Sequence, residues 1–365
     1  MKLLKRIFRI LLIIIGLAVL YVGGMIAYAM ITDYEPELTT EAKIESTASQ
    51  SSLRQDTLRL LNWNIGYCGL GEESDFFYDG GETVRMPREI VEKNLEGVKR
   101  VLEDYVPDYD FILLQEVEKD SRRSYHINQY EVLKDLFRGY AASFGKNYHV
   151  AFIPIPFTNP MGGVHSGLAT YTRYQPQKST RFSFEGNYDW PNYLFFLDRC
   201  FLVNRYPLEN GKELILINTH NSAYDDGTLR QRQMEQLSDV LIEEYQKGNY
   251  VLVGGDWNQK APGFTGFTDI PSAEGGIPIA ATYPEEGWTW AFDPDIPTNR
   301  QLIKPYDPAT TTRTLIDFYL LSPNIELVEV KTRDLGFAYS DHQPVELSVK
   351  LSGLHPEPDS VLSIE

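Results

Sequence analysis

Polar residues of the kinds used in hydrolytic chemistry stand at the ends of apolar segments of this chain. Asp317 lies inside such a segment. Ionised side chains are rarely buried alone, because removing them from water costs free energy, so one shared site would account for all of these residues. The candidates are Asn62, Asn64, Glu116, His220, Asp256, Asn258, Asp317, Asp341 and His342.

The oxygen donors in this set favour a hard divalent cation. Mg²⁺ typically binds one or two protein carboxylates and keeps several waters that a substrate phosphate can displace. Glu116 and Asn64 match that pattern, so we expect Mg²⁺ or Mn²⁺. Zinc is less well supported, because the chain has only six histidines and two cysteines and few of them have the spacing of zinc ligands.

Such a site suits the hydrolysis of a phosphate ester. That reaction requires neutralised phosphoryl oxygens, a well-aimed water and a stabilised leaving oxygen. A histidine such as His342 titrates near neutrality, and a buried aspartate that accepts its second N–H fixes the tautomer and raises the basicity. We expect Asp317 to have that role.

Strands and helices alternate around these residues. Phe111–Leu114 is a short apolar run typical of a strand buried on both faces, which places Glu116 at a strand end. Spacings of three and four predict helices near 91–105 and 229–245. Other predicted strands are 58–65, 148–153, 168–172, 194–203, 214–218, 250–253, 315–321 and 345–351. This order favours a mixed α/β fold built on two packed sheets.

Six short motifs carry a resemblance to the endonuclease/exonuclease/phosphatase superfamily, which has the fold of pancreatic deoxyribonuclease. They occur in the order of that superfamily and cover about 58–351. They are Leu61-Asn62-Trp63-Asn64-Ile65, Leu114-Gln115-Glu116-Val117, Asn218-Thr219-His220, Gly255-Asp256-Trp257-Asn258, Ile316-Asp317-Phe318 and Ser340-Asp341-His342-Gln343-Pro344-Val345.

The resemblance implies a four-layer α/β/β/α sandwich with two central mixed, mainly antiparallel sheets. It implies that Asn64, Glu116 and Asp341 hold the divalent cation. Asp256 would orient the attacking water, and Asn258 would contact the phosphate. His342, paired with Asp317, would serve as general acid and base, and His220 would donate to a non-bridging phosphate oxygen.

Structural alternatives stand beside several of these assignments. Asp341 and His342 could cap the last strand, and Asp317 could form a salt bridge with Arg313. His165 and Arg199 are possible substrate or phosphate contacts with structural alternatives of their own. An aromatic cluster could pack within a loop or touch a membrane; it comprises Tyr188, Trp190, Tyr193, Phe195 and Phe196.

The amino terminus has the composition of a membrane anchor. No charged residue occurs from Ile10 to Thr32, and about 20 apolar helical residues span a bilayer. Basic residues precede this segment and acidic residues follow it, so we expect a single-pass cell-membrane protein with a cytoplasmic amino terminus and an extracytoplasmic domain. A cleaved signal peptide is the alternative, since Ala27-Tyr28-Ala29 resembles a cleavage site.

The predicted organisation has four parts. Residues 1–32 form the basic flank and transmembrane helix, and 33–56 form a flexible linker rich in Thr, Ser, Glu and Gln. Residues 57–352 form the catalytic domain, and 353–365 form a tail. Cys68 and Cys200 are expected to be free thiols, with a single disulfide as the alternative.

Charge limits the substrate more than the motifs do. The chain has 51 acidic and 34 basic residues and a net charge of −17, which disfavours binding driven by positive charge. We expect a monomeric phosphoesterase with a lipid or small-molecule phosphoester as substrate, a bilayer contact through the amino-terminal helix and no protein partner that the sequence identifies. An extracytoplasmic nuclease and a catalytically silent binding module are the alternatives.

Overall fold

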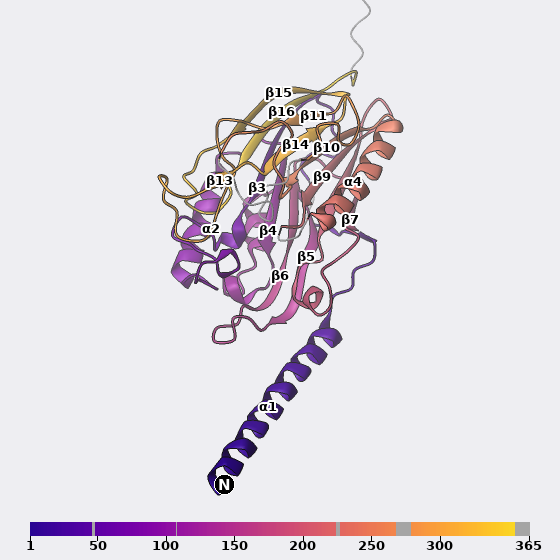
Figure 1. Cartoon of the computed structure of the whole chain (residues 1–365). Coiled ribbons are helices and arrows are strands. Elements are labelled where there is room, and N and C mark those ends of the chain that lie inside the picture. The colour runs from indigo at the N-terminus through magenta and orange to yellow at the C-terminus, as the bar shows by residue number, and fades with distance from the viewer. Residues whose placement is uncertain (46–47, 107, 224–226, 268–278, 355–365) are drawn as a thin grey trace, which may run out of the picture.

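The structure, a computed structural model, describes residues 1–45, 48–106, 108–223, 227–267 and 279–354. Two seven-stranded sheets form its centre, and one long helix projects from the domain (Figure 1). The helices are α1 (Lys2–Thr32), α2 (Arg88–Glu103), α3 (Gln129–Leu136) and α4 (Thr228–Gln246). The short 3-10 helices are η1 (Gly66–Cys68), η2 (Phe77–Asp79), η3 (Arg122–Ser124) and η4 (Asn192–Phe195).

The first sheet has the strand order β1-β7-β8-β9-β10-β14-β11. Its neighbouring strands are antiparallel, except that β9 and β10 are parallel. The strands are β1 (Thr39–Glu41), β7 (Lys178–Ser183), β8 (Cys200–Pro207), β9 (Glu213–His220), β10 (Tyr250–Asp256), β14 (Asp317–Leu321) and β11 (Thr289–Ala291).

The second sheet has the strand order β15-β16-β3-β4-β6-β5-β2, and here only β3 and β4 are parallel. A separate two-stranded ladder joins β12 (Asn299–Arg300) and β13 (Arg313–Thr314). The strands of the second sheet are β15 (Ile325–Thr332), β16 (Val345–Leu351), β3 (Thr57–Asn64), β4 (Phe111–Glu118), β6 (Gly162–Thr172), β5 (Ala141–Ile153) and β2 (Ile44–Glu45).

The alternation of side chains along each strand builds the core between the sheets. In β4, Phe111 and Leu113 face the other sheet, whereas Ile112 and Leu114 face the helical layer. All four are fully buried, and this explains why the strand reads as an unbroken apolar run. Each such side chain contributes about 1.5–3 kcal/mol of burial free energy.

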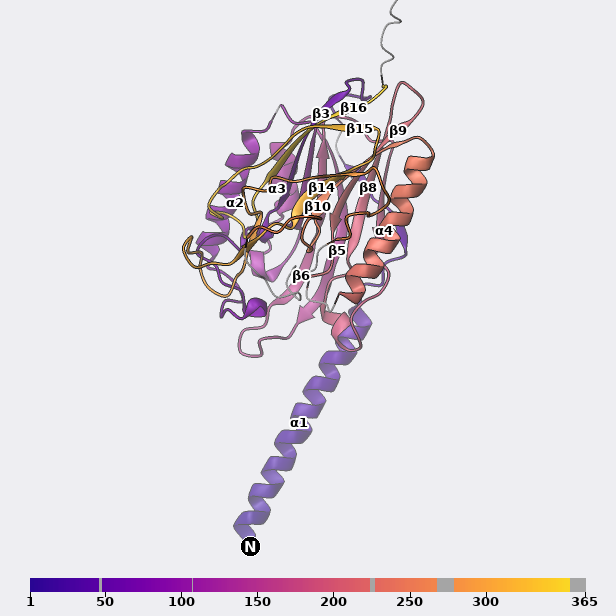
Figure 2. The same cartoon turned by 45° about the horizontal axis from the view of Figure 1, so that its top comes forward.

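Helices cover both outer faces of the pair of sheets (Figure 2). α2 and α3 pack on the second sheet through Val91, Val98 and Leu133, and α4 packs on the first through Leu237 and Leu241. The predicted four-layer α/β/β/α sandwich with two mixed sheets is therefore confirmed.

α1 is a single helix that is long and apolar enough to cross a membrane. Its exposed side chains are apolar over most of its length, and only Ala29, in its last turn, is buried against the domain. By length and composition alone, α1 could be a membrane anchor or a signal sequence.

The segment 33–56 differs from the flexible linker that we expected. β1 adds to β7 at one edge of the first sheet, and β2 adds to β5 at one edge of the second. Backbone hydrogen bonds to these sheet edges hold residues 39–41 and 44–45 of the segment in place, although it has few apolar side chains.

Several other elements differ from the sequence prediction. The predicted strand 194–203 is divided, since η4 ends at Phe195 and β8 begins at Cys200. The helix α3 and the strands β7 and β15 were not predicted, because they are short or alternate only weakly. The expected tail 353–365 lies outside the described residues from position 355 onward.

Candidate active site

The register of the first sheet brings three site residues together. β9 and β10 run parallel with His220 opposite Asp256. β14 runs antiparallel to β10 and places Asp317 opposite the same Asp256. Three residues that are far apart in sequence therefore stand side by side, because the carboxyl ends of the parallel strands β9 and β10 meet the amino end of the antiparallel strand β14 at one edge of the sheet.

The second sheet delivers Asn64 and Glu116 to the same edge. β3 and β4 run parallel with Asn64 opposite Gln115. A bulge between Leu114 and Val117 then interrupts the pairing of β4 with β6, and Glu116 adopts φ of +56°. A bulge redirects a side chain, and a left-handed backbone is unfavourable for glutamate, so surrounding contacts must stabilise this conformation.

His342 and Asp317 form a buried pair. His342 Nδ1 donates to Asp317 Oδ2 at 2.7 Å, and the Asp317 backbone N–H donates to Thr298 Oγ1 at 3.0 Å. Burial alone would lower the pKa of His342, but Asp317 and the nearby Asp341 and Asp256 carboxylates hold that pKa well above its usual value. The alternative ion pair of Asp317 with Arg313 is not formed among the described residues.

Asp256 is the centre of the polar network. Its Oδ2 accepts a hydrogen bond from Asn64 Nδ2 at 3.0 Å and lies 3.3 Å from His220 Nε2 and 3.7 Å from His342 Nε2. Its Oδ1 accepts the backbone N–H of Asn258 at 2.9 Å. Burial raises the pKa of Asp256, and the Asp317 charge adds to this effect.

His220 is a buried, neutral imidazole. Burial and the Arg199 charge lower its pKa well below the usual value. Its Nδ1 makes no hydrogen bond within the described part of the chain, whereas Nε2 faces Asp256. A neutral imidazole has one N–H, and with that proton on Nε2 the ring can donate to an oxygen near Asp256 in the cleft, while Nδ1 can only accept.

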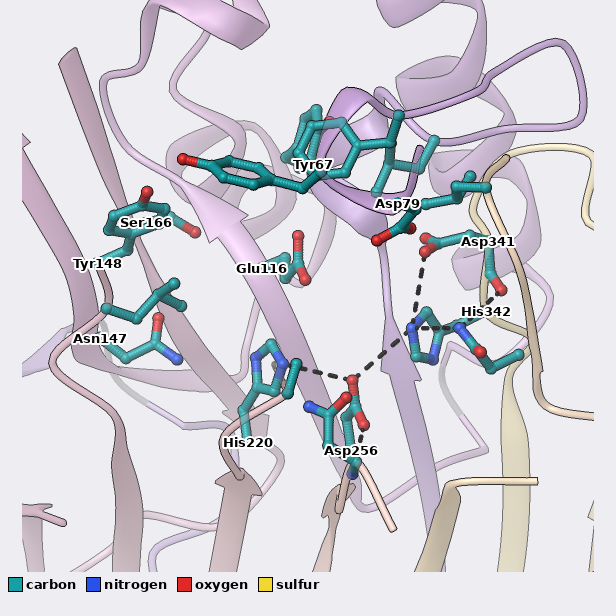
Figure 3. Close-up of a pocket in the computed structure, with 18 of the residues that line it drawn as sticks. Tyr67, Asp79, Glu116, Asn147, Tyr148, Ser166, His220, Asp256, Asp341 and His342 are labelled. Atoms are coloured by element: carbon teal, nitrogen blue, oxygen red, sulfur yellow. Dashed lines mark hydrogen bonds and ion pairs between the residues drawn. The ribbon is translucent and has the colours of Figure 1, made fainter. Parts of the chain in front are cut away.

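Glu116 and Asp341 also present carboxylates to this cleft (Figure 3). Burial and the Glu116 charge raise the pKa of Asp341 to about 7. Two carboxylates that repel each other in a buried cleft match the donor chemistry of Mg²⁺ or Mn²⁺, because a divalent cation would stabilise both in the ionised form. The donor set therefore fits such an ion.

Asn64 differs from the expected metal ligand in one respect. Its amide nitrogen, not its oxygen, faces the carboxylates, 3.3 Å from Glu116 Oε1 and 3.0 Å from Asp256 Oδ2. Its Oδ1 accepts the backbone N–H of Gly66 at 3.0 Å. In this orientation Asn64 links Glu116 to Asp256 and does not point an oxygen at a shared cation.

A second group of possible metal-ligand atoms is explained by the hydrogen bond between His342 and Asp317. Asp256, Asp317 and His342 place one such atom each within 4.8 Å of one another. The contact between His342 Nδ1 and Asp317 is a direct hydrogen bond, which leaves no room for an ion between those two atoms. The direct hydrogen bond thus accounts for this group of atoms without an ion.

The cleft has a volume of about 150 Å³, and its two walls differ in chemistry. One wall carries Glu116, His220, Asp256, Asn258, Asp341 and His342. The other is largely aromatic and aliphatic and includes Tyr67, Phe76, Tyr78, Tyr148, Met161, Tyr188, Phe196 and Leu197. The cleft therefore offers a charged site for a phosphoryl group beside an apolar surface for the rest of a substrate.

Two of the three basic side chains that line the cleft form hydrogen bonds within the protein. Arg123 Nε donates to the buried Glu118 at 2.6 Å, and its guanidinium lies over the Tyr67 ring. Arg300 donates to the carbonyls of Leu70, Gly71 and Ser74. Arg199 Nη1 and Arg300 Nε are buried nitrogens that lack a hydrogen bond to the described residues. The wall is thus poorly suited to a polyanion.

The remaining predictions have mixed outcomes. Cys68 and Cys200 are both free and buried, so no disulfide joins them. His165 does not line the cleft, although its neighbour Ser166 does. Arg199 lines the cleft, as the phosphate-contact alternative requires. Tyr188 and Phe196 of the aromatic cluster also line it, whereas Trp190 is 60% exposed.

Three supporting residues were missed. Asn299 places its amide nitrogen 3.0 Å from His342 Nε2, and Ser340 Oγ donates to the Asn64 carbonyl at 2.8 Å. Gln115 donates to both Asn62 and Asn218 across the core. Ser340, Gln115, Asn62 and Asn218 lie in the quoted motifs and could have been found there. Asn299 begins the two-residue strand β12, which has no local signal in the sequence.

Comparison with known proteins decides the family. The model of the endonuclease/exonuclease/phosphatase family matches residues 61–342, most of the chain. The chain belongs to the endonuclease/exonuclease/phosphatase family. Members of this family are hydrolases that act on phosphoester bonds, nucleases and phosphatases among them, so the chain is a phosphoester hydrolase by membership. Members generally use divalent metal ions. No curated protein matches the sequence.

Solved structures of the family share this fold. A Beutenbergia cavernae member is 18% identical, with 82% of this chain and 73% of that chain covered and a TM-score of 0.55. The catalytic domain of human Nocturnin with bound sulfate is 17% identical, with 85% of this chain and 98% of that chain covered and a TM-score of 0.51. ANGEL2, a 2′,3′-cyclic phosphatase, is 13% identical, with 86% of this chain and 98% of that chain covered and a TM-score of 0.52. At these identities the likeness concerns the fold.

Proposed function

We propose that this chain is a divalent-metal-dependent phosphoesterase in which water attacks a phosphodiester or phosphomonoester. The observation that carries the proposal is that Glu116, Asp256 and His342 face one cleft although they come from separate segments of the chain. Asp317 hydrogen-bonds to His342 behind that cleft, as expected of a group that fixes a catalytic imidazole.

Glu116 and Asp341 would hold the cation, with Asn64 keeping Glu116 and Asp256 in place. When bound, a divalent ion at this position neutralises charge on the phosphoryl oxygens and stabilises the leaving oxygen. A catalytically silent module would have no need of two repelling carboxylates in a buried cleft, and this disfavours that alternative.

Separate protein side chains orient the water, transfer the proton and bind the phosphate. Asp256 accepts a hydrogen bond from the attacking water and aims it, since its Oδ2 is the point on which the network converges. His342 exchanges a proton with the reacting oxygens through Nε2, because Nδ1 is committed to Asp317. His220, neutral and buried, donates to a non-bridging phosphoryl oxygen, and Asn258 contacts the phosphate from its place beside Asp256.

The substrate is better described as a lipid or small-molecule phosphoester than as a nucleic acid. The chain has a net charge of −17, and two of the three arginines in the cleft wall are engaged by the protein. Nucleic acids are bound mainly through basic side chains that neutralise phosphates. A nuclease remains the second candidate, because base stacking on aromatic rings would also suit the apolar wall.

We further propose that α1 is an uncleaved single-pass anchor with its basic end, Lys2 to Arg9, in the cytoplasm and the domain outside it. The burial of Ala29 and the contacts of α1 with β5 and η4 support this, since a signal peptide leaves no such contact in the mature protein. Detection of the α1 peptide in the purified membrane protein by mass spectrometry tests it.

Hydrolysis of bis-p-nitrophenyl phosphate by the full-length protein in detergent tests the activity. The full chain is needed because β1 and β2 lie within 39–45 and complete both sheets. We expect turnover with Mg²⁺ or Mn²⁺, none with chelator, and a loss of 10²–10⁴-fold in His342→Ala. His126→Ala, at an exposed histidine outside the cleft, is the matched control. If wild-type protein is inactive on this diester, DNA, phospholipids and nucleotides, the binding module is the better account.

A further inference from the structure

The membrane helix and the catalytic cleft lie at the same end of the domain. β3 and β4 run parallel to each other and end at the cleft with Asn64 and Glu116. β5 runs in the same direction as β4, because both are antiparallel to β6. α1 contacts β5 and η4, and it leaves the domain at the end where β5 finishes (Figure 1).

The connection between helix and domain is short and packed. Tyr34, the second residue after α1, lies edge-on to the ring of His149 in β5, with centroids 5.7 Å apart. The Lys146 ammonium lies 4.0 Å from the centre of the Tyr34 ring. In the last two turns of α1, Met25, Ile26 and Thr32 are partly covered and Ala29 is buried. No free spacer separates the helix from the domain.

The length of α1 determines where its contact with the domain lies relative to the membrane. The uncharged part from Ile10 to Thr32 measures roughly 34 Å at about 1.5 Å per residue, against roughly 30 Å for a hydrocarbon core. The carboxyl-terminal turns of the helix therefore reach the interfacial layer. The elements that pack on those turns, η4 and β5, are held at the same depth.

One loop joins this contact to the cleft. The segment 188–197 contains η4, which contacts α1, and also contributes Tyr188, Phe196 and Leu197 to the apolar wall of the cleft. Tyr148 of β5 donates from its hydroxyl to the Phe195 carbonyl at 3.0 Å and lines the same wall. The apolar wall is thus the part of the cleft nearest to the membrane helix.

Two large apolar side chains are exposed on loops beside this wall. Trp190 is 60% exposed on the loop that precedes η4, and Phe157 is 70% exposed on the loop between β5 and β6. Met161, at the end of that second loop, lines the cleft. Tryptophan is favoured at the boundary between water and lipid, where its ring is partly apolar and its N–H stays hydrated.

From these contacts we propose that the catalytic edge rests on the bilayer crossed by α1, and that the cleft takes a phosphodiester lipid directly from that membrane. This rests on the proposed phosphoesterase activity and assigns its substrate class. Trp190 and Phe157 enter the interface, and the apolar wall accepts the first part of the lipid that follows the phosphate. Water adds its oxygen to phosphorus, the P–O bond to the diacylglycerol breaks, and the released diacylglycerol oxygen takes a proton to become an alcohol. The phosphorus leaves in a water-soluble phosphomonoester of the headgroup.

The anchor compensates for the charge of the domain. A chain of net charge −17 is repelled by an anionic lipid surface and would gain little from free diffusion to it. Attachment through α1 turns the encounter into an intramolecular one, with a high effective concentration of lipid phosphate at the cleft. Orientation by the packed junction then decides which surface of the domain meets the lipid.

Fluorescence quenching tests the orientation without reference to catalysis. The full-length protein is reconstituted in vesicles of phosphatidylethanolamine and phosphatidylglycerol, with and without brominated acyl chains. We expect the brominated lipid to remove a component of tryptophan emission that is absent in Trp190→Ser. The control reporter is Trp190→Ser with Glu209→Trp, in the exposed turn between β8 and β9 at the opposite end of the sheet, which should show no quenching. Equal quenching of both reporters, or of neither, overturns the orientation.

Activity on two substrates separates the two proposals. Release of water-soluble phosphorus from the same vesicles should fall at least tenfold in the double variant Trp190→Ser, Phe157→Ser, while hydrolysis of bis-p-nitrophenyl phosphate stays within twofold of wild type. If the protein hydrolyses bis-p-nitrophenyl phosphate but not the vesicle lipids, the lipid assignment alone is overturned. Quenching at Trp190 in a protein that hydrolyses neither substrate overturns the phosphoesterase proposal and retains the orientation. An equal loss on both substrates also contradicts the inference, because it indicates a structural role for the two side chains.

Discussion

The indole N–H of Trp63 donates to the backbone carbonyl of His342 at 2.9 Å, and both residues are buried. Trp63 lies in β3 of the second sheet, whereas the partner of the His342 ring, Asp317, lies in β14 of the first. The loop that carries His342 is therefore held by its backbone from one sheet and by its side chain from the other. The position of the imidazole depends on how the two sheets pack.

Trp63→Phe should misplace His342 without removing any reacting group. The variant leaves a buried carbonyl without its donor, which costs about 1–3 kcal/mol of unfolding free energy, and it lets the loop shift. We expect kcat on bis-p-nitrophenyl phosphate to fall about tenfold, with KM within twofold of wild type. Urea denaturation and steady-state kinetics measure the two effects. Trp257→Phe, which loses a similar buried indole bond to Phe318, is the matched control. The same kcat loss in both variants would argue against a local effect on His342.

Removal of one carboxylate from the proposed cation site should weaken metal binding. Glu116→Gln keeps the size of the side chain but removes the charge that faces Asp341. We expect the Mg²⁺ concentration for half-maximal activity to rise at least tenfold, because a hard divalent cation depends on its few carboxylate ligands. Asp120→Asn, at an exposed acidic residue outside the cleft, should leave the Mg²⁺ titration unchanged. An unaltered titration in Glu116→Gln places the ion elsewhere.

The sequence predicts the residues of this site better than it predicts the structures that hold them. Buried strands read as apolar runs, and a polar residue at the end of a run is conspicuous, as Glu116 and Asp256 illustrate. The bulge that turns Glu116 into the cleft has no such signal, because φ of +56° at a glutamate reflects surrounding contacts and not local preference.

The same reasoning explains the errors outside the site. The polar segment 33–56 predicts a flexible linker, yet the open edges of two sheets hold its residues 39–41 and 44–45 through backbone hydrogen bonds that no side-chain pattern reports. The amide orientation of Asn64 likewise depends on Gly66 and Asp256. Interactions between segments that are distant in sequence leave little trace in either one alone.

A buried amide network joins the two sheets beneath the site, and its disruption should destabilise the fold. Gln115 Nε2 donates to Asn62 Oδ1 at 2.8 Å and to Asn218 Oδ1 at 2.7 Å, and Asn218 donates onward to the carbonyls of Leu114 and Ala169. Gln115→Leu leaves two buried amide oxygens without these donors. Each unsatisfied group costs about 1–3 kcal/mol, so we expect the unfolding free energy to fall by about 2–4 kcal/mol.

Urea denaturation of the detergent-solubilised protein measures this change. Gln233→Leu is the matched control, since this glutamine is also buried but, among the described residues, its side chain bonds only to Ser222, where it donates to Oγ and accepts the backbone N–H. We expect it to cost less than half as much. An equal loss at both positions would mean that the network between the sheets has no special contribution and that any buried glutamine is equivalent.

The ion pair of Glu244 with Arg205 should make stability depend on acid pH at a place remote from the cleft. Burial raises the pKa of Glu244, but hydrogen bonds from Arg205, Lys247 and Asn249 outweigh this and lower the pKa to about 2. Because the pKa is lower in the folded state than the usual 4.5, the stabilisation is complete above pH 4.5 and is lost as the pH falls toward 2. Solvent screens the partly exposed Arg205, so we expect about 1–2 kcal/mol.

Glu244→Gln therefore should reduce the unfolding free energy by about 1–2 kcal/mol at pH 7, and the difference from wild type should shrink progressively between pH 4.5 and pH 2. Urea denaturation at a series of pH values measures both curves. Glu243→Gln supplies the control, because this neighbour is 69% exposed and its ion pair within the described part of the chain is with Lys247, so its curve should follow wild type. Activity at pH 7 should be unchanged in both variants, since neither lines the cleft. A Glu244→Gln deficit that stays constant down to pH 3 would show that the lost stability comes from packing and not from the carboxylate charge.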